Sequence, residues 1–115
     1  MVYSFNDEIE TLLSDFEIPV SYMFYEGDAD TFITYQQESQ GNSMAGDDKI
    51  QGIVIFYDID IYSRGDYLKL VKDIITIFEG AGWTYQPTRT SADMYERDTK
   101  YFHKTLNFAK ESEGN

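Results

Sequence analysis

The sequence contains no cysteine, which excludes a disulfide framework and any zinc site built from thiolates. Basic residues are also scarce, since 9 Lys and Arg stand against 21 Asp and Glu, giving a formal net charge of −12. Such a chain repels phosphate backbones wherever it lacks a local basic patch, and the sequence contains no cluster of cations that would form one. We therefore expect no direct affinity for nucleic acid.

Long hydrophobic runs are absent as well. No stretch approaches the roughly 20 apolar residues that span a bilayer, so we expect no membrane partner. The N-terminal segment MVYSFNDEIE lacks the basic and apolar regions of a signal peptide, which predicts an intracellular protein. What the chain has instead is aromatic content, with 10 Tyr and 8 Phe among 115 residues. This composition predicts a single packed domain over residues 1–115 with an interface-forming surface.

The first half of the chain predicts one helix and two strands. Apolar residues at helical spacing follow Asn6, a candidate N-cap, and Pro19 ends this helix. Residues 20–25 and 31–38 are typical of strands. The polar segment Ser39–Lys49 is then expected to form a long loop.

Residues 50–62 predict an unusually long strand. Alternate isoleucines and Tyr57 give this strand one core face. Asp58 and Asp60 are expected on the opposite face, exposed to solvent. At about 3.3 Å per residue the strand reaches about 40 Å, so it must bend, bulge or project beyond the domain.

The second half predicts a further helix and two strands. The segment Ser63–Asp66 resembles a capping box, and the helix after it is expected to end at Gly80 and Gly82. We expect a short edge strand, a polar loop, a closing strand and a frayed tail at residues 83–88, 91–98, 100–109 and 110–115. The predicted fold is therefore α+β, a mostly antiparallel sheet with two helices packed on one face and a long projecting β-hairpin.

No catalytic, metal or cofactor site is predicted. The single histidine, His103, has no nucleophile signature near it and is expected at the surface or an interface. Asp58 and Asp60 point the same way from one strand, but alternation alone accounts for them. The acidic segments 28–30 and 47–48 lack the ligand spacing of a calcium loop. We therefore expect a protein that is not an enzyme.

Two short motifs are also interpreted as carrying no function. Arg64-Gly65-Asp66 spells a cell-adhesion tripeptide, but helix capping accounts for this segment. Neither glycine-rich phosphate-binding pattern, G-x-x-x-x-G-K or G-x-G-x-x-G, occurs.

The order of these segments resembles a known family. An amphipathic helix ending at Pro19, FITYQQES, the loop GNSMAGDDK, IQGIVIFYDIDIYS, the helix DYLKLVKDIITIFEGAGW and YFHKTLNF follow one another. Together they are similar to the small tail-component proteins of long-tailed bacteriophages and prophages, which include tail terminators, also called tail completion or minor capsid proteins. The similarity covers nearly the whole chain, and its most specific part is the loop that leads into the aromatic-rich strand.

The resemblance implies a structural subunit of the virion tail, made in the host cytoplasm. It implies a ring, commonly hexameric, that caps the tail tube and contacts tail-tube and head-connector proteins, while DNA passes through without specific binding. The candidates for subunit contacts lie in the loop and the long strand: Gln40, Asn42, Ser43, Met44, Val54 and Phe56. The candidates for an acidic lumen that repels the passing DNA are Asp28, Asp30, Asp47 and Asp48.

Two other functions remain open at this stage. An acidic module could mimic DNA and inhibit a nucleic-acid-binding protein, which requires carboxylates spaced like phosphates over one surface. A small-ligand binder of ferredoxin-like build would use a pocket that no sequence pattern reveals.

Overall fold

The computed structural model describes residues 4–44 and 50–113, and only the backbone of residues 42–44, 50, 51, 112 and 113. Two α-helices and six strands follow one another, with two short 3₁₀ segments, η1 and η2, between them. In chain order these are α1 (Asn6–Leu13), η1 (Ser14–Phe16), β1 (Val20–Tyr22), β2 (Thr31–Met44), β3 (Ile50–Ser63), α2 (Leu68–Gly80), β4 (Thr84–Tyr85), η2 (Pro87–Arg89), β5 (Met94–Tyr95) and β6 (Phe102–Glu113). The predicted α+β class is confirmed.

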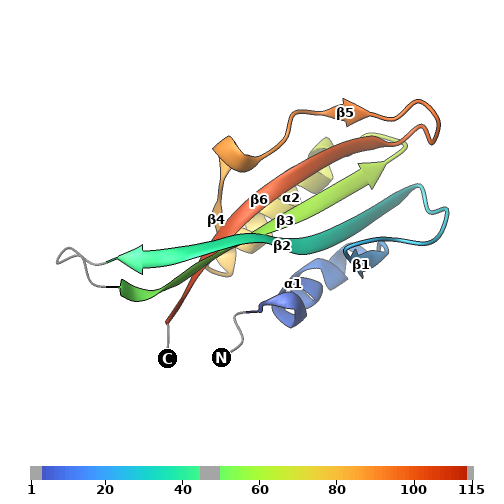
Figure 1. Cartoon of the computed structure of the whole chain (residues 1–115). Helices are drawn as coiled ribbons and strands as arrows, with labels where there is room; N and C mark the ends of the chain where they lie inside the picture. The colour runs from blue at the N-terminus through green and yellow to red at the C-terminus, as the bar shows by residue number, and fades with distance from the viewer. Residues whose placement is uncertain (1–3, 45–49, 114–115) are drawn as a thin grey trace.

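The strands form one sheet in the order β1-β2-β3-β6-β4, and β5 also pairs with β6 (Figure 1). Only β1 and β2 run parallel, and every other described pair is antiparallel. The sheet is therefore mostly antiparallel, as predicted, and β3 lies at its centre.

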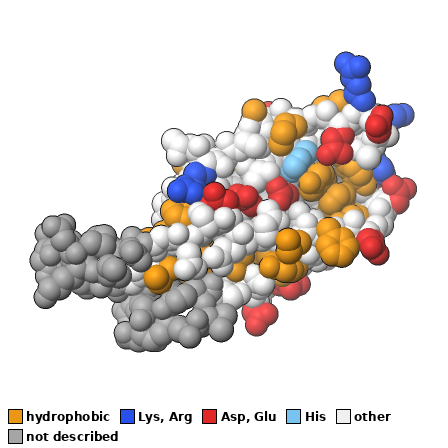
Figure 2. All heavy atoms as spheres, viewed as in Figure 1, with side chains coloured by type: hydrophobic (Ala, Val, Ile, Leu, Met, Phe, Trp, Pro, Cys, Tyr) orange, Lys and Arg blue, Asp and Glu red, His pale blue; other side chains and the backbone are white. Residues whose placement is uncertain are grey.

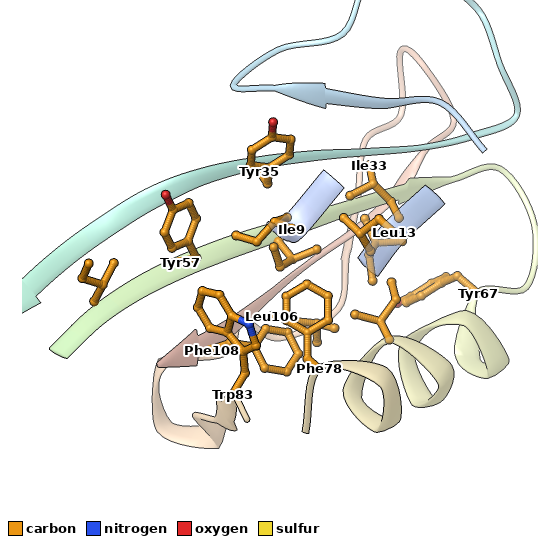
Figure 3. Packing of buried hydrophobic residues seen from close by; sticks show 14 residues of the cluster. Ile9, Leu13, Ile33, Tyr35, Tyr57, Tyr67, Phe78, Trp83, Leu106 and Phe108 are labelled. Carbon is orange, nitrogen blue, oxygen red and sulfur yellow. The ribbon is translucent and has the colours of Figure 1, made fainter. Parts of the chain in front are cut away.

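Both helices pack on the same face of the sheet, which we call the helix face (Figure 1). Alternate residues of β3 point into the core, and Ile55, Tyr57, Ile59 and Ile61 are all buried. Figure 3 shows side chains from both helices meeting those of β2, β3 and β6 in one cluster. The alternation predicted for the long strand is confirmed. The opposite face of the sheet, which we call the open face, carries the other half of each strand.

The hairpin of β2 and β3 is longer than the sequence predicts. Residues 39–44 were expected in a loop, but they continue β2 and pair with β3 as far as Met44 opposite Ile50. The register shifts between Gln37 and Ser39, so Glu38 is an extra residue that forms a bulge. Backbone pairing with β3 accounts for this strand, and a polar residue such as the exposed Gln40 is tolerated where a strand face is solvated. The rest of the predicted loop, residues 45–49, lies outside the described residues.

The C-terminal segment also differs from prediction. Residues 110–113 were expected to fray, yet they extend β6 and pair with β3, ending with Glu113 opposite Gly52. β6 therefore follows the hairpin beyond the helices (Figure 1). We call the three-stranded extension formed by residues 39–44, 50–54 and 110–113 the arm.

Helix capping was predicted correctly only at the end of α2. The N-cap of α1 is Phe5, not Asn6, whose Oδ1 instead accepts a hydrogen bond from Tyr57 at 2.7 Å. The prediction of a capping box at Ser63–Asp66 is also wrong, because α2 begins at Leu68. The backbone amide of Leu68 donates a hydrogen bond to the Asp66 carboxylate at 3.0 Å. After Gly80, Gly82 adopts a left-handed φ of 93°, as expected for a helix end.

Candidate assembly surfaces

The predicted subunit contacts lie on the β2–β3 hairpin, and all of them except Phe56 belong to the arm. Gln40 is exposed on β2, whereas Val54 and Phe56 are partly buried on the open face of β3. Asn42, Ser43 and Met44 lie in the same hairpin by their backbone pairing, and their side chains are outside the described part of the structure. The whole predicted set therefore lies on one hairpin, formed by β2 and β3.

Phe56 is covered by a side chain that the sequence analysis missed. The guanidinium of Arg89, from η2, lies 3.8 Å from the centre of the Phe56 ring. The same group forms an ion pair with Glu38 at 3.0 Å. Beside this stack is a hollow of about 420 Å³ whose lining includes Val54, Thr84 and Ala109. Phe56 is therefore less available to a partner than its sequence position suggested. No short-range pattern links Arg89 to Phe56.

Of the four predicted acidic lumen residues, the structure describes Asp28 and Asp30. Asp28 and Asp30 precede β2, and both form ion pairs with Arg64, at 2.8 Å and 3.5 Å. Asp47 and Asp48 lie outside the described residues, beyond Met44 at the other end of the strand. A strand of 14 residues spans roughly 45 Å at about 3.3 Å per residue. Asp28 and Asp30 are therefore a strand length away from the described end of the arm.

Arg64 fastens two loops together. Besides its bonds to the acidic loop, its Nε donates to the carbonyl of Thr99 at 3.1 Å, and its guanidinium lies 4.2 Å from the centre of the Tyr101 ring. The hydrogen bond to Asp28 raises the pKa of Arg64 above its usual value. The arginine of the adhesion-like tripeptide is thus engaged within its own chain.

The open face carries a row of stacked rings near the start of β2. Tyr25 stacks on Phe32 at 4.3 Å between centroids, Phe32 on Tyr62 at 4.6 Å, and Tyr62 on His103 at 4.0 Å. Phe32, Tyr62 and His103 are paired across β2, β3 and β6, which explains their alignment. In Figure 2 the only histidine lies beside acidic and hydrophobic side chains on this face. His103 is 18% exposed and stacked, so it lies partly buried at the surface of this face.

Asp60 was predicted on a solvent face, and this prediction is wrong. The residue is only 9% exposed, and its carboxylate accepts hydrogen bonds from Gln36 at 2.8 Å and from Thr105. His103 Nε2 lies 3.3 Å from its Oδ1. Burial opposes ionisation of Asp60, but the bonds from His103, Thr105 and Gln36 outweigh it and hold its pKa below the usual value. Neighbouring strands supply all three partners, which alternation within β3 could not reveal.

Asp58, the next acid on this face, has the opposite electrostatic environment. Burial raises its pKa, the hydrogen bond from Asn107 at 2.8 Å only partly offsets this, and the charges of Asp60 and Glu38 add to the rise. Asn107 itself is fully buried, and its Oδ1 accepts no hydrogen bond within the described part of the chain. Both aspartates are therefore hydrogen-bonded within the sheet, with Asp60 buried and Asp58 partly exposed.

Large hydrophobic side chains are exposed at the two opposite edges of the sheet. We call the group beside β1 the β1 patch, and the group around β5 and the start of β6 the Phe102 patch. The β1 patch consists of Tyr22, Met23 and Phe24, and the Phe102 patch consists of Leu68, Met94, Tyr95 and Phe102. Neither patch is predicted from the sequence, in which residues 91–98 are expected in a polar loop and residues 20–25 in a strand.

We also looked for metal sites and membrane-spanning helices among the described residues. No group of three or more His, Asp or Glu side chains there could hold a metal ion. No helix among them is long and apolar enough to cross a membrane. Compared with models of protein families and with curated proteins, the chain matches none.

Proposed function

We propose that the protein is a structural subunit of the tail of a long-tailed bacteriophage, a tail terminator or completion protein that assembles with copies of itself into a ring. The observation that carries this proposal is the arm. A 115-residue chain of 51 × 25 × 23 Å extent commits two strands of 14 residues each to a hairpin that runs past both helices (Figure 1). Among the described hydrophobic side chains of the arm, Ile53 alone packs against the core cluster.

The arm supports self-assembly because it carries an unused strand edge. β1 pairs with β2 only at Ile33–Tyr35, and no described strand pairs with the outer edge of β2 beyond that point. A row of unpaired backbone groups is a template for pairing with another chain. The ring would cap the tail tube and contact tail-tube and head-connector proteins, first in the host cytoplasm and then in the virion.

The net charge supports passage of DNA rather than its capture. A formal charge of −12 gives the assembled ring a strongly negative field. DNA sliding through such a ring is repelled from its wall and finds no cation-lined groove to bind. The charge of Arg64 partly neutralises Asp28 and Asp30, because both form ion pairs with it. In this proposal the repulsion of DNA therefore comes from the whole surface and not from these two residues.

The DNA-mimic alternative has weaker support. A mimic presents its carboxylates to a basic partner, whereas the carboxylates of Asp58 and Asp60 accept hydrogen bonds within the sheet. A pull-down on basic host proteins separates the two functions, because a tail subunit should retain none of them.

The test shortens the arm. Replacing residues 43–52 with Asn-Gly joins Asn42 to Ile53, which already pair, through a two-residue turn and leaves the core intact. We expect ring-shaped oligomers of the wild type by light scattering and negative-stain microscopy, and only monomers of the shortened variant, with little change in melting temperature. A control replaces residues 45–49 with an equally long Gly-Ser segment and should still assemble.

Two outcomes would count against the proposal. A shortened variant that assembles as well as the wild type would remove the arm from the assembly. A wild type that stays monomeric at every concentration would contradict self-assembly, and retention of a basic nucleic-acid-binding protein in the pull-down would then favour the mimic.

A further inference from the structure

From the two exposed edges we infer that neighbouring copies associate head to tail, with the β1 patch of one copy docked on the Phe102 patch of the next. This inference rests on the self-assembly proposed above and adds a second contact, separate from the arm. Exposed hydrophobic groups of this kind mark interaction sites in soluble proteins.

The β1 patch is held in a fixed shape. Phe24 is 68% exposed, and the chain presents it by turning at Met23, whose φ of 68° lies in the left-handed region that residues other than glycine rarely adopt. Two backbone hydrogen bonds hold this turn, from Met23 to the carbonyl of Tyr35 at 3.0 Å and from Phe24 to that of Tyr22 at 2.8 Å. The hydrophobic side chains are therefore preorganised, which lowers the entropic cost of docking.

The Phe102 patch offers places to receive such side chains. One hollow of about 380 Å³ lies between Phe102 and Leu68, and a second of about 370 Å³ lies between Phe102 and Tyr95. The Phe102 ring is supported by Tyr95 at 4.8 Å and by Tyr67 at 6.1 Å between centroids. An exposed aromatic residue with a hollow on either side suits a projecting apolar turn.

Charge distinguishes the two edges. Arg97 and Lys100, in the turn between β5 and β6, are exposed, and neither side chain forms an ion pair within the described residues. Near the β1 patch, Glu17 and Glu26 are exposed and likewise unpaired in the described part of the chain. Exposed Glu96 and Asp98 share the turn with Arg97 and Lys100, so this edge carries both signs, whereas Glu17 and Glu26 make the other edge acidic. A head-to-tail contact therefore brings unpaired acids of one copy to the edge that carries the unpaired cations of the next, in a chain whose cations are few.

The symmetry of the contact follows from these positions. β1 and β5 lie on opposite edges with three strands between them, so the patches are about 19 Å apart at roughly 4.8 Å per strand. A contact between two β1 patches would bring like charges together. Contacts between different patches of identical subunits repeat from copy to copy, and they give a ring when the rotation closes.

The experiment uses the absence of native cysteine. Two variants, Glu26→Cys and Arg97→Cys, place one thiol beside each patch at an exposed position without altering the hydrophobic residues. Each variant is treated with a short bifunctional maleimide alone and in an equal mixture, at a concentration where the wild type forms oligomers. We expect covalent dimers in strong excess in the mixture. A variant carrying both substitutions should give a ladder that ends at the size of the closed assembly.

The outcomes separate this inference from the proposed function. Dimers that form equally well from either variant alone would show a contact between like edges and would overturn the inference. The same holds if no cross-link forms while the wild type is oligomeric, since assembly then depends on the arm alone and the proposed function stands. A wild type that is only monomeric would overturn both. Phe102→Ala, which deletes the central ring, should reduce the heterotypic cross-link.

Discussion

Asp60 and His103 form a contact across β3 and β6 in which Oδ1 of the aspartate lies 3.3 Å from Nε2 of the imidazole. Because Tyr62 stacks on the other side of this imidazole at 4.0 Å, the ring cannot turn away without breaking an aromatic contact. Gln36 and Thr105 complete the hydrogen bonds of the carboxylate. The pair thus joins the three central strands on the open face of the sheet.

Asp60→Asn should destabilise the protein by about 1–3 kcal/mol near neutral pH, because one acceptor oxygen becomes a donor that meets other donors. The pKa of Asp60 is lower in the folded state than its ordinary 3.8. The contribution of the carboxylate is therefore complete above that ordinary value and is lost as the pH falls through the lower, folded value. Urea unfolding of wild type and variant across this range measures the difference, and a pH-independent difference would contradict the assignment.

Asp58→Asn should behave in the opposite way. Burial raises the pKa of Asp58, so the ionised carboxylate costs stability that appears as the pH rises through its folded pKa. The amide removes this charge and keeps an oxygen that can accept the bond from Asn107. We expect equal or higher stability than the wild type at neutral pH, with the gain vanishing in acid. The same urea series tests it, and a loss comparable to that of Asp60→Asn would show that both acids are needed as charges.

Tyr57→Phe should loosen the first helix. The Tyr57 hydroxyl donates to Asn6 Oδ1 at 2.7 Å and accepts from the amide of Phe5 at 3.0 Å. Its loss leaves two partly buried polar groups unpaired, at a cost of about 1–2 kcal/mol. Amide hydrogen exchange should rise first at Ile9 and its neighbours. Tyr35→Phe is the matched control, because its hydroxyl bonds only to the exposed Glu10, and it should lose less.

Arg89→Ala should uncover Phe56. The stack of guanidinium on ring contributes about 0.5–1 kcal/mol at such an exposed site. Arg89→Lys keeps the charge near Glu38 but not the planar group, so it should recover only a small part of the loss. Thermal unfolding compares the three proteins. Full recovery by lysine would mean that the ion pair, and not the stack, covers the ring.

Much of the fold could be predicted from periodicity, and the exceptions have a common cause. The long strand and α2 carry their own pattern, because one face of each is buried in the core. Residues 39–44 carry no apolar alternation, and backbone pairing with β3 holds them in the strand. For the same reason β5 was missed, because its two residues are held by pairing with β6 and are exposed.

The candidate surfaces were harder to predict than the fold. Alternation placed Asp60 on the correct face of β3 but could not show that Gln36 and His103, from strands far away in the sequence, would close over it. The β1 patch depends on one left-handed residue, Met23, which no propensity favours there. Features set by contacts between distant segments are invisible to a pattern confined to neighbouring residues.

The position of β3 also determines how the molecule bears a load. β3 is hydrogen-bonded to β2 on one side and to β6 on the other, from the arm back to Ser63. A pull on the arm along its axis runs parallel to the strands and across these backbone bonds, so many bonds resist it together. The helices and their core contacts lie behind the other end of the same strands (Figure 1). The arm thus continues the three central strands of the sheet, so tension on it passes directly into these strands.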